Sequence, residues 1–211
     1  MFLVCARCGQ LALDQAVRPA APGYAEAVCP SCGHIYPFRF RPLPVVTGAS
    51  GSGKSTLAVG LAPRLGHVFC FENDILWQPC FNTPGDGYHA FRTGLLRVAL
   101  NVNQSRVTTA LFASVMPQDL ETHALARYFD GLSFLILSCP DEVLAARLRA
   151  RPAWRASGDD GFISAMRNFN GQLRRARGQN VSHLDTSAVT VVGAQAIVQQ
   201  WLESIVGPAE A

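Results

Sequence analysis

The stretch Thr47-Gly-Ala-Ser-Gly-Ser-Gly-Lys-Ser-Thr56 matches the pattern G-x-x-x-x-G-K-[ST] in full. Glycines at these positions let the backbone curl so that successive N–H groups point inward, a path that Cβ atoms would obstruct. An apolar run at 43–47 precedes the stretch and a helical pattern at 54–65 follows it. Because the dipole of such a helix favours an anion at its N-terminus, the stretch predicts a P-loop, which binds the phosphates of a nucleoside triphosphate.

Two side chains of this loop have distinct expected roles. Lys54 is expected to reach the β- and γ-phosphates of ATP, and the Ser55 hydroxyl is expected to bind magnesium. A glycine-rich turn that binds nothing is the alternative, but its four fixed positions match by chance on the order of once in a hundred such chains. The predicted nucleotide-binding residues are Gly48, Ala49, Ser50, Gly51, Ser52, Gly53, Lys54, Ser55 and Thr56.

The overall composition is that of a globular protein. The chain has 211 residues, enough for one full core and a small appended module, and 49% of them are hydrophobic and 16% charged. The net charge of +3 permits a basic patch but does not by itself predict nucleic-acid binding. No run of eighteen apolar residues is present, and the N-terminus lacks the basic start of a secretion signal, so no membrane segment is expected.

Four of the seven cysteines form two C-x-x-C pairs, Cys5 with Cys8 and Cys29 with Cys32. Each pair presents two thiolates on one side of a turn, and the twenty residues between the pairs fit a tetrahedral zinc site with four cysteine ligands. Four sulfur ligands make such a zinc ion structural rather than catalytic. A redox pair or unrelated free thiols are the alternatives, but no thioredoxin-like strand and helix surround these cysteines. An odd cysteine count with metal ligation indicates a reducing compartment, and a cytoplasmic location is expected.

The chain divides into two regions of different character. Residues 1–36 hold the cysteine pairs and little else that forms a core, 37–42 predict a proline-stiffened linker, and 43–211 alternate apolar runs with helical patterns. Strands are predicted at 43–47, 67–71, 107–113, 132–138 and 181–185, and helices at 54–65, 88–102, 119–128, 141–151, 162–179 and 194–205. This alternation indicates a three-layer α/β fold with a five-stranded parallel sheet, plus a small zinc-ribbon-like module at the N-terminus. Ligands of such sheets bind at the carboxyl ends of the strands.

The loop and the order of elements over residues 43–206 resemble the small-molecule and nucleoside kinases of the P-loop superfamily, relatives of shikimate, gluconate and adenylate kinases. The resemblance implies that an acidic residue after the second strand accepts the proton of the acceptor hydroxyl. Asp74 is the first choice for this base, and Glu72 the second; Glu72 is otherwise expected to contact magnesium or substrate, or to face solvent. Arg92 and Ser114 are further expected substrate contacts.

The same resemblance implies a lid around residues 152–161. Arg147, Arg151 and Arg155 recur every four residues, so that the first two share a helix face, and Pro152 then ends the helix. In similar kinases this segment brings arginines to the transferring phosphoryl group, and Arg151 and Arg155 are expected to be the catalytic ones. A solvated basic face is the alternative.

One departure from similar kinases concerns the third strand. Their third strand often ends in an aspartate associated with magnesium, whereas this one ends at Ala113 followed by Ser114. Magnesium support is then expected through water from Glu72 or Asp74. The missing carboxylate bears on which reaction is catalysed and not on whether a nucleotide binds.

Three further features each have two interpretations. Trp77 and Phe81 form either an apolar wall for a base or ring, or part of the core. The run Asp185-Thr-Ser187 lies where similar kinases contact adenine through the backbone, so no catalytic role is assigned to it. The arginines at 174, 175 and 177 are interpreted as solvated surface.

The expected function is transfer of the γ-phosphoryl group of Mg-ATP to a hydroxyl of a nucleoside or another small metabolite. One alternative is a polynucleotide 5′-hydroxyl kinase that docks RNA or DNA on the cysteine module and the basic clusters. Another is an ATP-gated regulatory module with weak ATPase activity, whose cysteine module contacts a partner protein. No oligomeric state is predicted.

Overall fold

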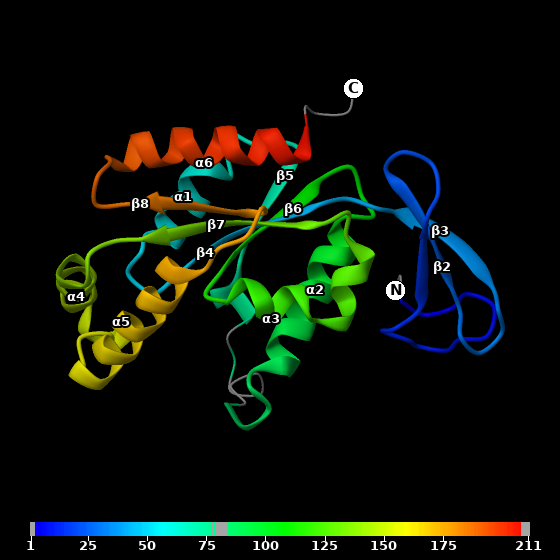
Figure 1. Ribbon diagram of the computed structural model, residues 1–211, viewed down its shortest axis with the longest axis horizontal. Helices are drawn as coiled ribbons and strands as arrows, with labels where there is room; N and C mark the ends of the chain where they lie inside the picture. The colour runs from blue at the N-terminus through cyan, green and yellow to red at the C-terminus, as the bar shows by residue number, and fades with distance from the viewer. Residues whose placement is uncertain (1–2, 77, 79–83, 208–211) are drawn as a thin grey trace.

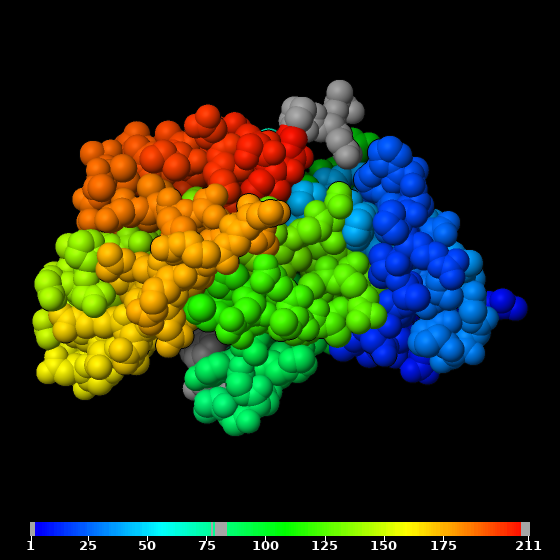
Figure 2. All heavy atoms as spheres, viewed as in Figure 1, coloured from blue at the N-terminus to red at the C-terminus, as the bar shows by residue number. Residues whose placement is uncertain are grey.

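The computed structural model describes residues 3–76, 78 and 84–207 and contains an α/β domain with a small N-terminal module beside it (Figures 1 and 2). Trp77 and Phe81, for which an apolar wall was one prediction, lie outside the described residues. Among the described residues, no helix is long and apolar enough to cross a bilayer.

A five-stranded parallel sheet in the order β5-β6-β4-β7-β8 forms the centre of the domain. Its strands are β4 (Leu43–Gly48), β5 (Val68–Glu72), β6 (Thr108–Ala113), β7 (Leu132–Ser138) and β8 (Val181–Asp185). Every residue of β4 and β6 is buried, which explains their continuously apolar sequences. The five predicted strands are present to within one residue at each end, and the predicted fold class is confirmed.

Helices cover both faces of the sheet and complete the three layers (Figure 1). On one face, α1 (Lys54–Leu61) packs against α6 (Val191–Val206); on the other lie α2 (His89–Val102) and α5 (Asp160–Arg175). Successive strand residues point to opposite faces. Val45 accordingly joins the core beneath α2, and its neighbour Val46 joins the core beneath α1 and α6.

The helix predicted over 119–128 is in fact two short elements. They are α3 (Pro117–Glu121) and the 3-10 helix η4 (Ala124–Tyr128). The break occurs at His123, whose Nδ1 accepts the N–H of Leu125 at 3.1 Å and so caps a new turn. A histidine that caps through its ring nitrogen is not a signal that sequence patterns distinguish from helix interior.

Other helix ends differ from prediction for similar local reasons. α5 begins at Asp160 because Asp159 caps it, and α6 begins at Val191 because Thr190 caps it. α1 ends at Leu61 and α4 (Asp141–Arg149) ends two residues before its predicted end. Three single 3-10 turns, η1 (Asn73–Leu76), η3 (Pro84–Asp86) and η5 (Ala153–Arg155), were not predicted.

The N-terminal module is a three-stranded antiparallel sheet that the sequence did not predict. It comprises β1 (Ala16–Pro19), β2 (Tyr24–Val28) and β3 (Ile35–Arg39) in that order. β3 includes residues 37–39, the first half of the predicted 37–42 linker. Pro37 is tolerated within this strand because β3 lies at the edge of the module's sheet. Figure 1 shows the module at the end of the main sheet where β4 begins, whereas α4 lies toward the other end, at which β4 leads into the glycine loop and α1.

Candidate functional site

The glycine loop joins β4 to α1 along a path that side chains would block. Gly51 and Gly53 have φ angles of 91° and 105°, in the left-handed region that favours glycine. At Gly48, a Cβ atom would lie 2.3 Å from Ser52 Oγ and 2.6 Å from the carbonyl oxygen of Leu137. The loop therefore turns tightly into the N-terminus of α1, an arrangement suited to a phosphate chain.

The Lys54 ammonium group is buried within this loop. Its Nζ donates to the carbonyl oxygens of Gly48 at 2.7 Å and Ala49 at 3.1 Å. Burial lowers the pKa of Lys54 to about 8, while the nearby Asp74 carboxylate acts in the opposite direction. A desolvated cation whose partners are neutral carbonyls is well placed to bind an anion, because little hydration is lost when the anion arrives.

Ser55 and Glu72 meet at the start of α1. Ser55 Oγ donates a hydrogen bond to the carboxylate of Glu72, which ends β5. The proton of the hydroxyl is thereby turned toward Glu72, and the oxygen lone pairs remain available for a cation. Glu72 thus supplies a carboxylate beside Ser55 although the third strand has none. These residues fit a magnesium ion, whose preferred ligands are oxygen atoms.

Ser114 directly follows β6, the strand that ends without a carboxylate. Its Oγ donates to the carbonyl oxygen of Gly48 at 3.0 Å. The hydroxyl therefore braces the glycine loop against the end of β6, and its proton is used within the protein.

A small cavity of about 50 Å³ collects most of the predicted chemical groups. Asp74, in η1 just beyond β5, lines it together with Glu72, Ser114 and Arg151. Its other lining residues come from the loop: Ser50, Gly51, Gly53, Lys54, Ser55 and Thr56. The structure thus brings together residues from four separate segments at the carboxyl ends of β4, β5 and β6, the edge at which parallel sheets bind ligands.

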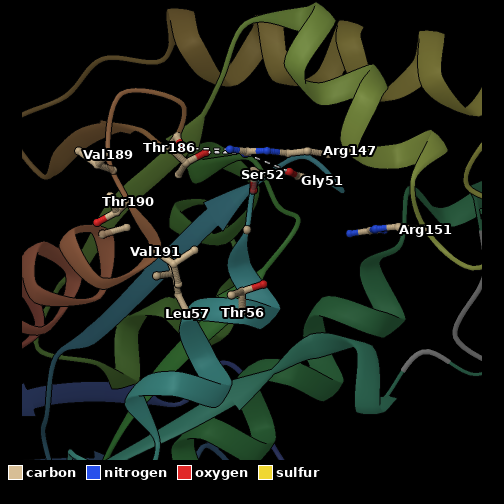
Figure 3. A pocket seen from close by; sticks show the side chains of 12 residues that line it. Gly51, Ser52, Thr56, Leu57, Arg147, Arg151, Thr186, Val189, Thr190 and Val191 are labelled. Atoms are coloured by element: carbon tan, nitrogen blue, oxygen red, sulfur yellow. Dashed lines mark hydrogen bonds between the residues drawn. The ribbon is translucent and has the colours of Figure 1, made fainter.

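A larger cavity of about 300 Å³ adjoins the glycine loop on its other side (Figure 3). Part of its wall is apolar, formed by Leu57, Val189, Val191 and Ala194. The remaining lining residues are Gly51, Ser52, Gly53, Thr56, Arg147, Arg151, Thr186 and Thr190. Apart from Gly48 and Ala49, whose carbonyls bind Lys54, every predicted nucleotide-binding residue lines one of the two cavities. An apolar wall with a few polar groups beside a phosphate-type loop suits a nucleotide base.

Arg147 spans the large cavity and was not among the predicted site residues. Its guanidinium donates to the hydroxyl of Thr186 at 2.9 Å, to the carbonyl oxygen of Thr186 at 3.0 Å and to the carbonyl oxygen of Gly51 at 3.4 Å (Figure 3). It therefore fastens the loop after β8 to the glycine loop. The available sequence signal was its spacing of four residues from Arg151, but the predicted shared helix face is wrong, because α4 ends at Arg149 and Arg151 lies after it.

The two predicted lid arginines have different surroundings. Arg151 lines both cavities, and burial, with Arg155 adding to the effect, lowers its pKa while Asp74 acts in the opposite direction. Arg155 lines neither cavity; its guanidinium lies 5.0 Å from the ring centre of Trp154, which is 79% exposed. Within the predicted lid at 152–161, Ser157 is buried and its hydroxyl donates to the Leu148 carbonyl.

Arg92 lies on α2, outside both cavities. Its NH1 is 3.5 Å from a carboxylate oxygen of Asp119. Next to it, the rings of His89 and His123 stack with their centres 4.8 Å apart, and burial lowers the pKa of His123 to about 4. The structure therefore does not bring Arg92 to the group of residues around Asp74.

The four cysteines of the N-terminal module form a compact cluster. Their Sγ atoms all lie within 4.8 Å of one another, with Cys5 and Cys32 at 3.7 Å and Cys8 and Cys29 at 3.6 Å. A tetrahedral ion with metal–sulfur bonds of about 2.3 Å separates its ligands by about 3.8 Å, whereas a disulfide requires about 2 Å. This four-cysteine cluster therefore has the dimensions of a tetrahedral metal site and not of two disulfides.

No family model matches the chain, and no curated protein matches it in sequence. Solved structures do share its fold. A sugar kinase from Janibacter sp. HTCC2649 is 22% identical, with a TM-score of 0.61 over 81% of this chain and 97% of that one. A gluconokinase from Sinorhizobium meliloti 1021 is also 22% identical, with a TM-score of 0.53 over 79% and 98%. A deoxyadenosine kinase from M. mycoides is 14% identical, with a TM-score of 0.51 over 77% and 99%. The chain has the P-loop kinase fold with a distant sequence.

Proposed function

We propose that the chain is an ATP-dependent kinase that transfers the γ-phosphoryl group of ATP to a hydroxyl group of a nucleoside, sugar or other small metabolite. The observation that carries this proposal is the convergence of Lys54, Asp74 and Arg151 on the small cavity, directly beside the larger cavity with its partly apolar wall. The fold shared with solved sugar and nucleoside kinases supports it.

The nucleotide side of the site binds Mg-ATP, which supplies the phosphoryl group and a divalent charge. The apolar side chains of Leu57, Val189 and Val191 contact the base, and the backbone of residues 48–56 surrounds the phosphates. Lys54 neutralises charge on the β- and γ-phosphates. The Ser55 oxygen, oriented by its hydrogen bond to Glu72, would bind the magnesium ion, which would supply a divalent charge beside the phosphates.

The acceptor side supplies the base and the remaining charge. The oxygen of the acceptor hydroxyl forms a bond to the γ-phosphorus, and Asp74 accepts the proton of that hydroxyl. The bond from the γ-phosphorus to the β,γ-bridging oxygen breaks, and ADP leaves. Arg151 and Lys54 stabilise the charge on the transferring group. Arg155 joins them when the turn η5 moves toward the cavity, with Ser157 holding the far end of that segment in place.

The structure offers less support for the two alternative functions. Asp74 follows the carboxyl end of β5, whereas the cysteine module lies at the end of the sheet where β4 begins (Figure 1), so the module does not extend the acceptor side as a docking surface for a polynucleotide end. The regulatory alternative rested on the missing third-strand carboxylate, and Glu72 now provides a carboxylate at Ser55.

We further propose that the four-cysteine cluster binds one structural zinc ion. The tetrahedral spacing of the sulfur atoms supports it, as do the two similar turns that carry them: Gly9 N–H donates to Cys5 O at 2.8 Å, and Gly33 N–H donates to Cys29 O at 3.0 Å. Metal analysis of the purified protein is expected to give one zinc per chain. A fully folded protein without metal would refute this proposal.

An acceptor screen tests the kinase proposal. The purified protein is incubated with Mg-ATP and a panel of nucleosides, sugars and sugar acids, and ADP release is compared with and without each acceptor. Acceptor-dependent ADP release, with phosphate found on the acceptor by mass spectrometry, is expected for the wild type. Lys54→Ala is expected to abolish it. Slow hydrolysis that no acceptor accelerates would contradict the proposal.

A further inference from the structure

Gln15 joins the two cysteine turns of the N-terminal module. Its side chain is buried, and its Nε2 donates to the carbonyl oxygens of Leu3 at 3.3 Å and Ala12 at 3.2 Å, which flank the turn of Cys5 and Cys8 on either side. The Tyr36 hydroxyl, which follows the second turn, donates to its Oε1 at 2.5 Å. Through both N–H donors and its oxygen, the Gln15 amide therefore holds together the chain segments that flank the two cysteine turns.

The same residue connects the module to η4 of the kinase domain. The N–H of Gln15 donates to the Tyr128 hydroxyl at 2.9 Å, and Arg127 donates to the carbonyl oxygens of Asp14 at 3.0 Å and Gln15 at 3.5 Å. Phe38 of β3 also meets Tyr128 edge to face, with ring centres 6.0 Å apart. The cysteine turns and η4 thus share one hydrogen-bonded and packed junction.

The hydrophobic cores extend this connection to one face of the sheet only. Leu3, Ala25, Ala27 and Phe38 of the module belong to the core that also contains residues of α2 and η4. α2 in turn contacts η1, the turn that carries Asp74. The core beneath α1 and α6, on the nucleotide side, contains no residue of the module among those described.

We propose that metal binding by the four-cysteine cluster controls the order of η4, α2 and η1, so that loss of the metal stops phosphoryl transfer while leaving ATP bound. The metal fixes both cysteine turns; Gln15 and Tyr128 pass this constraint to η4; and η4 packs on the helix that supports the turn of Asp74. The consequence for phosphoryl transfer rests on the function proposed above, but the structural linkage does not.

Hydrogen exchange with and without the metal tests the linkage directly. The full chain is treated with a zinc-selective chelator in excess magnesium, and amide exchange is compared with the zinc-loaded protein. Exchange of amides in α2 and η4 is expected to accelerate by about tenfold or more, and that in α1 and α6 by less than about twofold. Binding of ATP itself, measured by calorimetry on the same two samples, is expected to change by less than about twofold.

Two matched variants exclude a general effect of the chelator. Cys8→Ser removes the exposed ligand and is expected to reproduce the exchange pattern of chelation. Cys70→Ser replaces a thiol of β5 outside the cluster and is expected to leave the wild-type pattern unchanged.

A third variant, Tyr128→Phe, tests the link between the module and η4. It keeps the ring and removes the hydroxyl that Gln15 N–H binds, so chelation is expected to affect α2 less in this variant than in the wild type. Chelation of the wild type keeps the test valid should Cys8→Ser fail to fold.

Three outcomes would overturn the proposal: exchange that increases only within the module, exchange that increases equally in α1 and α6, or no change at all. None of these measurements needs an acceptor or turnover. A failed acceptor screen would therefore contradict the kinase proposal, and with it the consequence for phosphoryl transfer, without affecting the structural linkage; failure of the exchange test would overturn the linkage without affecting the kinase proposal.

Discussion

The nucleotide side and the acceptor side of the small cavity are built in different ways. On the nucleotide side, the phosphate-binding loop consists of consecutive residues, 48–56, and its lysine binds carbonyls only five and six positions away. The acceptor side takes Asp74 from a 3-10 turn, Ser114 from the end of β6 and Arg151 from the segment after α4. A local backbone path therefore defines the phosphate-binding loop, and the packing of distant elements defines the acceptor side. Variants on the two sides are expected to separate binding of ATP from transfer of its phosphoryl group.

Among the variants that separate the two sides, the largest expected effect comes from Asp74→Asn. The amide cannot accept the acceptor proton, so kcat is expected to fall by about 1,000-fold, within the range typical of a lost general base. ATP affinity is expected to stay within about twofold, because Asp74 belongs to the acceptor side. Steady-state kinetics with the acceptor found in the screen, together with calorimetric titration of ATP, measure both quantities.

Asp86→Asn is a suitable control for this variant. Asp86 accepts the N–H groups of His89 and Ala90 at the start of α2 and lines neither cavity, so a large loss of kcat in this variant would indicate general damage to the region. Full activity in Asp74→Asn would remove Asp74 from the mechanism and with it the distinction between the two sides.

The contrast between the two sides also explains what the sequence could reveal. The glycine loop, the parallel sheet and the cysteine cluster follow from spacing along a few tens of residues, and all three were predicted. Arg147 was missed because its partners, Thr186 and Gly51, lie 39 and 96 residues away. Arg92 was predicted to bind substrate, yet Asp119 lies beside it, a pairing that no local pattern indicates.

The N-terminal module is a second example of structure that local sequence patterns did not reveal. Its antiparallel sheet was not predicted because Ala25 and Ala27 are small and alternate with polar or exposed residues. These alanines belong to a core that they share with residues of the α/β domain. Burial supplied by another part of the chain leaves little trace in the composition of a short strand.

A smaller but specific effect is expected from Glu72→Gln. The variant keeps the shape of the side chain and still accepts the hydrogen bond of Ser55, but loses the negative charge beside the cation site. The magnesium concentration for half-maximal activity is expected to rise by about 10-fold, as for other groups that orient a metal ligand. Activity measured against magnesium concentration gives this value, and Glu142→Gln, on α4 and paired with Arg167, is the surface control. An unchanged magnesium requirement would remove Glu72 from metal support.

Arg147→Lys is expected to act on the nucleotide side alone. A lysine cannot reproduce the two hydrogen bonds to Thr186 and the third to Gly51, so the wall of the large cavity loosens. The Kd for ATP is expected to rise by about five- to tenfold with kcat changed by less than about twofold. Arg174→Lys on α5 is the matched control, and a kcat effect larger than the Kd effect would place Arg147 on the acceptor side.

The smallest expected effect is a pH dependence of ATP binding that comes from Lys54. Burial lowers its pKa to about 8 in the free protein, and bound phosphates raise it again, so binding takes up a proton above this pH. ATP affinity is therefore expected to fall by about threefold from about pH 7.5 to 8.5. Over the same window the contribution of Lys54 to the stability of the free protein rises, because unfolded lysine, with a pKa of about 10.4, binds more protons than the folded one.

Calorimetry in buffers of different ionisation enthalpy measures this proton uptake, and Lys54→Arg is the control for it. Arginine keeps its charge throughout the window, so the variant is expected to show no proton uptake, whatever its absolute affinity. Uptake that persists in Lys54→Arg would assign the titration to another group. Asp74 and Glu72 both act against the lowering of the Lys54 pKa, so Asp74→Asn should lower this pKa further and move the proton uptake to lower pH. The nucleotide side and the acceptor side, although separate in sequence, are therefore coupled through charge.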